Sequence, residues 1–191
     1  MPKKLISIIV PAYNESDCVD ELARRLKLIF AAEPNYDFEC VIIENGSTDD
    51  TFEKLLKINA EDPRFKILQL ARNFRMDGGL TAGLSVISGD ACVLMTADLQ
   101  DPPELAMEFV KEWEAGYKIV LATKPVSEGN QFVHFLRKMY YRILDKISDI
   151  KLLRDATGVG LYDKKVLDEI RKINDPYPYL RGLICELGYP I

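Results

Sequence analysis

The chain has 191 residues, of which 48% are hydrophobic and 29% are charged, and its formal net charge is −5. These values are typical of one soluble globular domain with a sizeable core. An acidic chain without a broad basic region argues against nucleic-acid binding, and no apolar run approaches the roughly 18 residues of a membrane-spanning helix. Four widely separated cysteines and no secretory apolar segment predict a cytoplasmic protein with reduced thiols.

Strands and helices are predicted to alternate along the first two thirds of the chain. Apolar runs favour strands at 5–10, 38–43, 65–70, 91–95 and 118–122, and helical spacing favours helices at 19–30, 78–87 and 102–113. Residues 47–50 have the form of a capping box, which predicts a further helix through Leu55. Pro102 is expected to open the last of these helices. The alternation predicts an α/β fold with a mostly parallel central sheet flanked by helices.

The last third of the chain has a different pattern. Residues 132–147 predict a long amphipathic helix with a basic face, which either packs on the core or lies against an anionic membrane surface. The single histidine, His134, has no partner for a two-histidine metal site. Lys164–Lys172 predicts a further helix. Because the chain ends at Ile191 directly after an apolar segment, we expect the natural protein to continue.

Asp98 and Gln100 follow the predicted strand at 91–95. In open α/β sheets, ligands bind beyond the carboxyl ends of the strands. If the chain is extended here, the two side chains point the same way and suit a divalent cation such as Mg²⁺ or Mn²⁺, which keeps other positions for water and phosphate. The structural alternative is an Asp98 that caps a helix beside a solvated loop.

Two further polar loops follow the first and second strands. Pro11 and Tyr13 could frame a flat base, and Glu15 could accept a hydrogen bond from the base or the ribose. Alternatively, Glu15 simply suits a helix N-terminus. Glu44 ends an apolar strand, where a carboxylate is explained either by a base or ribose or by a helix cap.

A third polar loop follows the third strand, where Arg72 and Arg75 could face phosphates or pair with surface acids. All of these loops are expected at one edge of the sheet. No GxGxxG follows the first strand and no GxxxxGK[ST] occurs, which disfavours a dinucleotide oxidoreductase or a P-loop enzyme. A GxSxG nucleophile elbow is also lacking.

Six motifs together resemble the family-two glycosyltransferases of GT-A fold, nearest the dolichol-phosphate mannose synthase-like, polyprenyl-phosphate branch. They are IIVPAYNE at 8–15, ENGSTDDT at 44–51, ARNF at 71–74, LTAGL at 80–84, ADLQDPPE at 97–104 and TGVGLYD at 157–163. The resemblance covers essentially the whole chain. It implies one catalytic domain at 1–191, with a nucleotide-sugar half at 1–100 and an acceptor half at 101–191.

The resemblance also implies roles for particular residues. Asp98 corresponds to the retained acid of the Asp-x-Asp motif, with catalytic and metal-binding roles, and Gln100 to a second metal ligand. Lys124 and Arg137 fall near the cations that contact the acceptor phosphate. The implied nucleotide-binding set consists of Pro11, Ala12, Tyr13, Glu15, Ile42, Glu44, Asn45, Arg72, Asn73, Ala97 and Asp98.

Three departures from the family pattern bear on metal dependence and acceptor type. Thr96 stands where the first acid of Asp-x-Asp is usual, and Glu44-Asn45 replaces the usual Asp-Asp. The usual Gly-Asp-Phe-Arg segment, which carries an acid and an arginine, is here residues 158–160, Gly-Val-Gly.

The resemblance implies an inverting transfer of sugar from a UDP- or GDP-linked donor to a polyprenyl phosphate, at the cytoplasmic face of a membrane. A phosphate needs no general base, whereas a hydroxyl acceptor would, and Asp155 and Asp163 are the nearest candidates. Two alternatives stay open: a polysaccharide synthase with a hydroxyl acceptor, and a nucleotide-binding homologue without turnover. A nucleotidyltransferase is disfavoured because no glycine-rich loop with basic residues follows the first strand.

Overall fold

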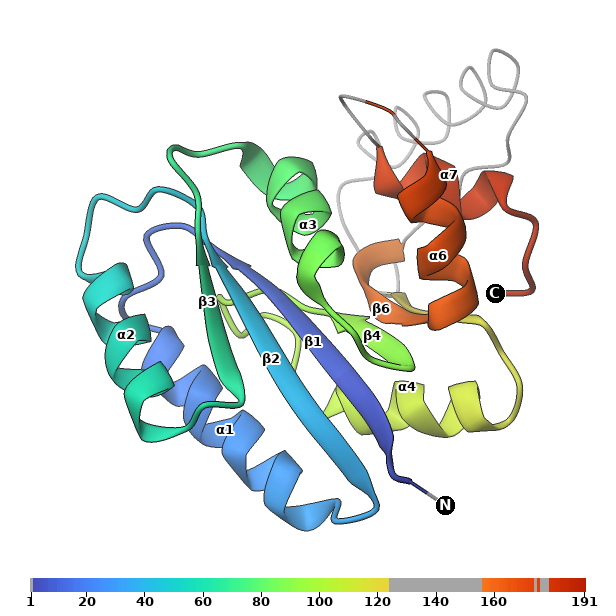
Figure 1. The fold of residues 1–191 in the computed structure, drawn as a ribbon, viewed down its shortest axis with the longest axis horizontal. Coiled ribbons are helices and arrows are strands. Elements are labelled where there is room, and N and C mark those ends of the chain that lie inside the picture. The colour runs from blue at the N-terminus through green and yellow to red at the C-terminus, as the bar shows by residue number, and fades with distance from the viewer. Residues whose placement is uncertain (1, 124–155, 174, 176–178) are drawn as a thin grey trace, which may run out of the picture.

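A six-stranded sheet in the order β3-β2-β1-β4-β6-β5 forms the centre of the protein (Figure 1). The computed structural model describes residues 2–123, 156–173, 175 and 179–191. The strands are β1 (Lys4–Ala12), β2 (Tyr36–Glu44), β3 (Phe65–Gln69), β4 (Ala91–Leu94), β5 (Ile119–Thr123) and β6 (Ala156–Asp163). The helices are α1 (Val19–Ala32), α2 (Thr51–Glu61), α3 (Arg75–Val86), α4 (Leu105–Glu114), α6 (Lys164–Lys172) and α7 (Leu180–Glu186).

The pairing of β1 with β2 and β4, and of β2 with β3, is parallel. This confirms the predicted α/β fold with a mostly parallel sheet. The sequence did not predict β6, which runs antiparallel between β4 and β5. Gly158 and Gly160 weaken the strand signal there, but glycine is required at position 160 because a Cβ would collide with the backbone oxygen of Val120.

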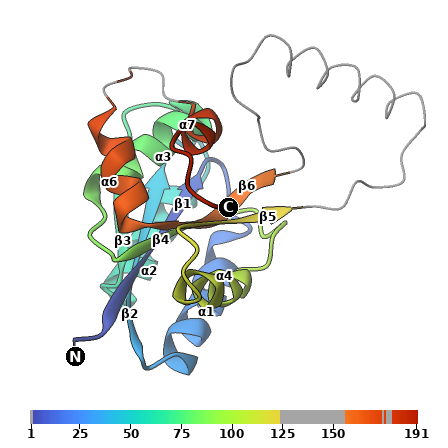
Figure 2. The ribbon, with the colours of Figure 1, turned by 90° about the vertical axis from the view of Figure 1, so that its right-hand side faces the viewer.

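Apolar side chains pack on both faces of the sheet, which explains why the central strands read as continuous apolar runs. One core contains Ile8 and Val10 of β1 under α1, α2 and α4. The other contains Ile9 of β1 under α3, α6 and α7. Figure 2 shows α1 and α4 on one side of the sheet and α3, α6 and α7 on the other.

Several predicted boundaries need correction. The helix predicted at 78–87 begins earlier, at Arg75, and α4 begins at Leu105, after a turn that contains Pro102. The predicted capping box is wrong, because Asp50 is the N-cap of α2 and its side chain makes no capping bond. Helix α7 was not predicted. The predicted helix at 132–147, His134, Lys124 and Arg137 lie outside the described residues.

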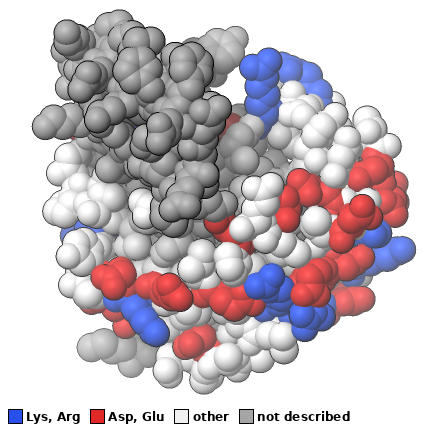
Figure 3. All heavy atoms as spheres, turned by 180° about the vertical axis from the view of Figure 1, so that it is seen from behind, with Lys and Arg blue, Asp and Glu red and all other residues white. Residues whose placement is uncertain are grey.

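The surface carries no continuous basic area over the described part of the face in Figure 3, where acidic and basic side chains are intermixed. In the parts of the chain that the structure describes, no helix has the length and apolarity needed to cross a bilayer.

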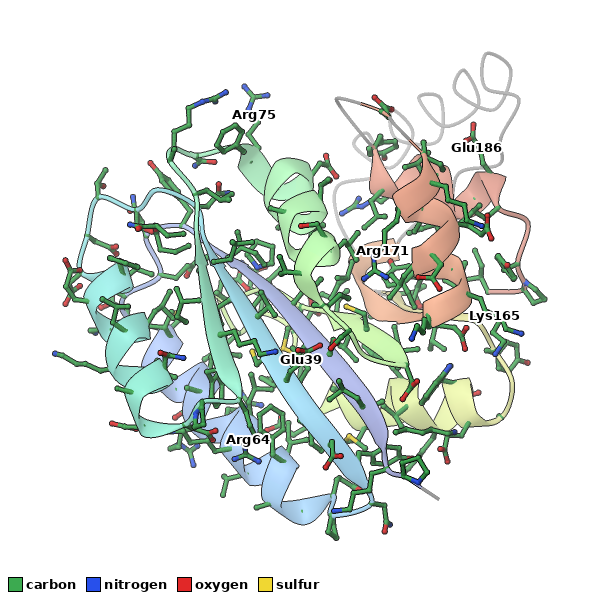
Figure 4. The ribbon with its side chains drawn as sticks, viewed as in Figure 1. Glu39, Arg64, Arg75, Lys165, Arg171 and Glu186 are labelled. Atoms are coloured by element: carbon green, nitrogen blue, oxygen red, sulfur yellow. The ribbon has the colours of Figure 1, made fainter. Side chains whose placement is uncertain are left out.

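Glu39 is the most highly connected buried charge in the sheet, with 4% of its surface exposed (Figure 4). Its Oε1 accepts from Ser7 Oγ at 2.6 Å and from the Ser88 N–H at 2.8 Å, and its Oε2 accepts from Lys66 Nζ at 2.6 Å. Burial alone would raise the pKa of Glu39, but these hydrogen bonds outweigh it and the pKa is lowered. The ionised carboxylate therefore ties the turn after α3 to the sheet.

Replacement of this carboxylate gives the first prediction. Because the folded-state pKa lies below the ordinary value of 4.5, the contribution of Glu39 to stability is present above that pH and is lost as the pH falls through the folded pKa. Glu39→Gln should lower the free energy of unfolding at pH 7 by about 2 kcal/mol, and the deficit should shrink below pH 4.5. Urea denaturation of the wild type and the variant at pH 7 and at pH 3 measures this difference in the free energy of unfolding.

The matched control is Glu169→Gln, which removes an exposed carboxylate 2.7 Å from Lys172 Nζ. An exposed pair of this kind contributes little to stability, so this variant should unfold like the wild type. A Glu39→Gln deficit that stays constant from pH 7 to pH 3 would contradict the proposed role of the charge.

Candidate functional site

Four loops leave the carboxyl edge of the sheet after β1, β2, β3 and β4. The parallel register pairs Ala12 with Glu44 and Glu44 with Gln69, so the first three strands end together. Figure 1 shows the three corresponding loops at the same end of the sheet. The N–H of Met95, at the end of β4, binds the carbonyl of Ile9. The structure therefore brings together the loops in which the sequence placed its candidate residues.

Backbone strain is concentrated at this edge. Asn14, Arg75 and Leu99 are the non-glycine residues with positive φ in the described ranges, at 55°, 63° and 58°. They lie in the loops after β1, β3 and β4. Strained conformations of this kind persist only where surrounding contacts fix them, and they cluster at functional sites.

The loops after β1 and β2 are joined by side-chain hydrogen bonds to the backbone. The Asn14 N–H donates to Ser47 Oγ at 3.1 Å, and the Thr48 N–H donates to Asn14 Oδ1 at 2.8 Å. The Glu15 N–H donates to Thr51 Oγ1 at 2.9 Å at the start of α2. Ser47 therefore binds the neighbouring loop instead of capping α2.

An open hollow of about 860 Å³ lies beside these loops. Its lining includes three carboxylates, Glu44, Asp49 and Glu53, and one cation, Arg72. Tyr13 is 42% exposed at its rim. A flat ring and carboxylate acceptors beside a cavity suit the base and ribose of a nucleotide, whose N–H and O–H groups can donate to them.

Glu44 and Asn45 are both almost completely buried, at 1% and 4% exposure. Glu44 Oε1 accepts from the Ser47 N–H, and its Oε2 has no hydrogen bond to a described residue. Asn45 uses both ends of its amide on the loop after β3. One oxygen of Glu44 therefore has no hydrogen-bond partner among the described residues, whereas each end of the Asn45 amide is bound to backbone.

The chain around Asp98 forms a turn, so the expected extended conformation is wrong. Leu99 adopts a left-handed conformation, and the Gln100 N–H folds back to Asp98 Oδ1 at 3.2 Å. Thr96 Oγ1 donates to the same oxygen at 2.7 Å. Asp98 does not cap α4, whose N-cap is Glu104. Its Oδ2 has no hydrogen-bond partner within the described segments and is available to a ligand.

A second space, the inner cavity, has a volume of about 180 Å³ and lies between α3, β4, β6 and α7. Most of its lining is apolar, and its polar lining residues include Asp77, Thr96 and Arg181. This cavity could not be predicted from the sequence, because its walls come from four elements that are distant along the chain and include the unpredicted β6 and α7.

The pKa of Glu15 reflects the negative charge at this edge of the sheet. Partial burial raises the pKa of Glu15, and the nearby carboxylates of Asp98 and Asp49 raise it further. Glu15 and Asp98 therefore lie close enough to repel each other. A cation between these groups would relieve the repulsion.

The oxygen atoms of Asp98 and Gln100 suit a divalent cation whose remaining coordination positions are filled by a bound nucleotide and water. No group of three or more histidine, cysteine or carboxylate side chains that could hold a metal occurs among the residues described. Asp98 Oδ2 has no hydrogen-bond partner among the described residues and the Gln100 side chain is exposed, so each could give an oxygen to Mg²⁺ or Mn²⁺ when phosphates and water supply the remaining positions. The turn at Leu99 removes the same-side arrangement that an extended chain would give them.

The other candidate residues have different environments. The side chains of Ala12, Ile42 and Ala97 are at most 1% exposed and belong to the core, so only their backbones could face a ligand. Pro11 is partly exposed, and Asn73 is exposed and lines the hollow. Asp49 lines the hollow too, but the sequence was interpreted there as part of a capping box.

Asp163 cannot be the general base considered for a hydroxyl acceptor. It pairs with Ala91, at the start of β4, because β6 is antiparallel, and so it lies at the opposite edge of the sheet from Asp98. Its carboxylate binds Trp113 Nε1 at 2.7 Å, Lys118 Nζ at 2.8 Å and the N–H of Lys165 at 2.9 Å. Asp155 lies outside the described residues.

Solved structures that align with this fold include two glycosyltransferases. Glucosyl-3-phosphoglycerate synthase of Mycobacterium tuberculosis, solved with Mn²⁺, UDP-glucose and phosphoglyceric acid, aligns with a TM-score of 0.62 at 18% identity, over 85% of this chain and 58% of that one. The mannosyltransferase PcManGT of Pyrobaculum calidifontis, solved with GDP-mannose and Mn²⁺, aligns with a TM-score of 0.59 at 17% identity, over 88% and 47%. The fold is that of the GT-A glycosyltransferases.

The sequence profile of glycosyl transferase family 2 matches residues 7–171, and the chain belongs to that family. It is 36% identical over 186 residues to the uncharacterized glycosyltransferase YkcC of Bacillus subtilis, covering 96% of this chain and 57% of that protein. It is 28% identical over 184 residues to the bactoprenol glucosyl transferase of Shigella phage SfV, covering 96% and 60%. The chain thus spans less than two thirds of the length of these relatives.

The Glu15 environment gives the second prediction. Asp98→Asn removes the charge but keeps an oxygen that accepts from Thr96 and Gln100, so the turn should persist. The pKa of Glu15 should fall toward its ordinary value of 4.5 while staying above it, because burial is the larger cause of the shift. Carboxyl ¹³C NMR titration measures this, with Asp37→Asn at the start of β2 as the control. An unchanged Glu15 pKa would show that the two carboxylates do not interact.

Proposed function

We propose that this chain binds a nucleotide diphosphate sugar, UDP- or GDP-linked, at the carboxyl edge of the sheet and transfers the sugar, with inversion, to a polyprenyl phosphate. The observation that carries the proposal is the set of interactions that Asp98 makes. This residue is hydrogen-bonded to Thr96, which lines the inner cavity, and it interacts with Glu15, two residues beyond Tyr13 at the rim of the open hollow.

The mostly negative charge of the open hollow favours one orientation of the nucleotide sugar. Three carboxylates and one arginine are unfavourable for a diphosphate but suit a base and a ribose, which donate hydrogen bonds. The diphosphate would therefore extend toward Asp98, where a divalent cation held by Asp98 and Gln100 would neutralise its charge. The sugar would then reach the inner cavity beside Thr96.

The acceptor phosphate would act as its own nucleophile. Its second pKa is near roughly 6, so it is largely a dianion at neutral pH. One of its oxygens would attack the anomeric carbon, and the bond from that carbon to the diphosphate would break, with the electron pair leaving on the nucleoside diphosphate. No proton has to be removed, and this chain then needs no general base.

The relatives support this acceptor. Bactoprenol glucosyl transferases match 96% of the chain, and the name of these proteins specifies a polyprenyl lipid. We propose a working position at the cytoplasmic face of a membrane, with Lys124 and Arg137 as contacts for the acceptor phosphate.

Transfer to a hydroxyl is a second candidate because of Asp77. This partly buried carboxylate lines the inner cavity together with Thr96, where it could accept a proton from a hydroxyl acceptor. The two candidates differ in whether catalysis needs this carboxylate.

The third prediction tests the catalytic role of Asp98. Asp98→Asn should lower the rate of sugar transfer by about 100-fold or more and should weaken the Mn²⁺-dependent part of UDP or GDP binding in calorimetry. Asp37→Asn should behave like the wild type. Unchanged turnover by Asp98→Asn would remove this residue from the mechanism, and a wild-type chain that binds neither UDP nor GDP, with or without Mn²⁺, would refute the proposed function.

The fourth prediction tests the acceptor in the full-length protein. Asp77→Asn should transfer sugar to polyprenyl phosphate at the wild-type rate, because no base is required. Product formation is followed by thin-layer chromatography with a radiolabelled donor. If the wild type instead glycosylates a soluble saccharide and ignores polyprenyl phosphate, and Asp77→Asn abolishes that activity, the hydroxyl acceptor is correct.

A further inference from the structure

Asn45 is joined to the loop after β3 by both ends of its side chain. Its Oδ1 accepts from the Phe74 N–H at 2.9 Å, and its Nδ2 donates to the Arg75 carbonyl at 3.1 Å. At 4% exposure, this amide has little surface to offer a ligand. A buried amide with both ends bound to backbone is suited to fixing one conformation of that backbone.

Gly46 reinforces the connection by direct backbone contact. Its φ is +74°, and a Cβ there would lie 2.8 Å from Arg72 Cα and from the Arg72 carbonyl carbon. The loop after β3 therefore rests on Gly46 at a distance that a side chain would prevent.

The conformation held in this way is a strained one. Arg75 has a φ of 63°, and its N–H donates to Asn73 Oδ1 at 2.7 Å. Figure 4 shows Arg75 at the start of α3, at the outer edge of the structure. A left-handed arginine costs free energy, so Asn45 and Asn73 are needed to keep the loop in this form.

The loop after β3 contributes Arg72 to the lining of the hollow, together with Leu70, Ala71 and Asn73. The Arg72 guanidinium lies 4.1 Å from the centre of the Phe74 ring, and the N–H of Phe74 is the one that Asn45 binds. Among the described residues that line the hollow, Arg72 is the one cation. Asn45 therefore binds the backbone of the residue whose ring contacts the Arg72 guanidinium.

We propose that Asn45 is a positioning residue that places Arg72 for the nucleotide and does not itself contact the ligand. The proposal rests on the proposed function, since it assumes that the hollow takes a nucleotide. It also explains the amide at a position where an acid is usual. A carboxylate at position 45 could not donate to the Arg75 carbonyl and would repel it.

The test is UDP and GDP binding by the 191-residue chain, measured by calorimetry with Mn²⁺. Asn45→Asp should weaken binding about tenfold. The matched control is Asn59→Asp, because Asn59 Nδ2 also donates to a backbone carbonyl, that of Phe65 at 2.6 Å, at the other edge of the sheet. Asn59→Asp should lower the melting temperature without changing the dissociation constant.

A double-mutant cycle with Arg72→Ala separates positioning from general stability. In the Arg72→Ala background, Asn45→Asp should have no further effect on binding, because the group that it positions is gone. Additive losses in the cycle, or wild-type affinity in Asn45→Asp, would overturn the proposal.

Gly46→Ala provides a second route if Asn45→Asp does not fold, and it should give the same loss of affinity and the same coupling to Arg72. Affinity equal to the wild type in Gly46→Ala would also overturn the inference. These failures differ from failure of the proposed function, in which the wild-type chain itself binds neither nucleotide.

Discussion

The site depends on one constraint, which is that β1 is buried on both faces and paired on both sides. Ile6, Ile8, Ile9 and Val10 are 0% exposed, and the strand is hydrogen-bonded in parallel to β2 and β4. A shift of one residue would exchange the two apolar faces and bring side chains of the wrong size into both cores. Because the register is fixed in this way, the ends of β1, β2 and β4 are fixed too, and with them the loops that carry Glu15, Glu44 and Asp98.

The loops themselves are joined to one another by polar contacts. Asn14 links the first two loops, Asn45 links the second and third, and Thr96 orients Asp98 within the fourth. Each contact restrains a backbone that contains or adjoins a left-handed residue. The rigid sheet supplies the position of the edge, and these side chains supply the local geometry, a division of roles that is common in ligand-binding α/β proteins.

Patterns that repeat along the chain were the ones that sequence could predict. The prediction of helix α1 was correct because its apolar side chains recur at helical spacing. The predictions of β1, β2 and β4 were correct because these strands are unbroken apolar runs. Strand β6 was missed because Gly158 and Gly160 lower its strand propensity while serving contacts across the sheet. The direction of β6 in turn decides that Asp163 lies far from Asp98, which no local pattern could reveal.

The sequence predicted which loops form the candidate site, but it did not predict what the individual residues of these loops contact. Motif position assigned Asn45 and Ile42 to the nucleotide, but it gave no indication that the Asn45 amide is bound to backbone at both ends or that the Ile42 side chain lies in the core. The extended chain expected at Asp98 and Gln100 fails at Leu99, whose left-handed conformation depends on its surroundings and not on its own preference.

Two of the departures from the family pattern, Thr96 and Asn45, are compensated within the structure, which argues against decay of the site. Thr96 donates to Asp98 Oδ1 and so orders the retained carboxylate while leaving Oδ2 open. A second acid at position 96 would add negative charge to an edge where Asp98 and Asp49 already raise the pKa of Glu15. Thr96 and Asn45 each satisfy a partner that an ionised carboxylate could not, because they donate a hydrogen bond. Thr96 and Asn45 therefore fit the hydrogen-bonding pattern of this edge, in which each of them donates a hydrogen bond.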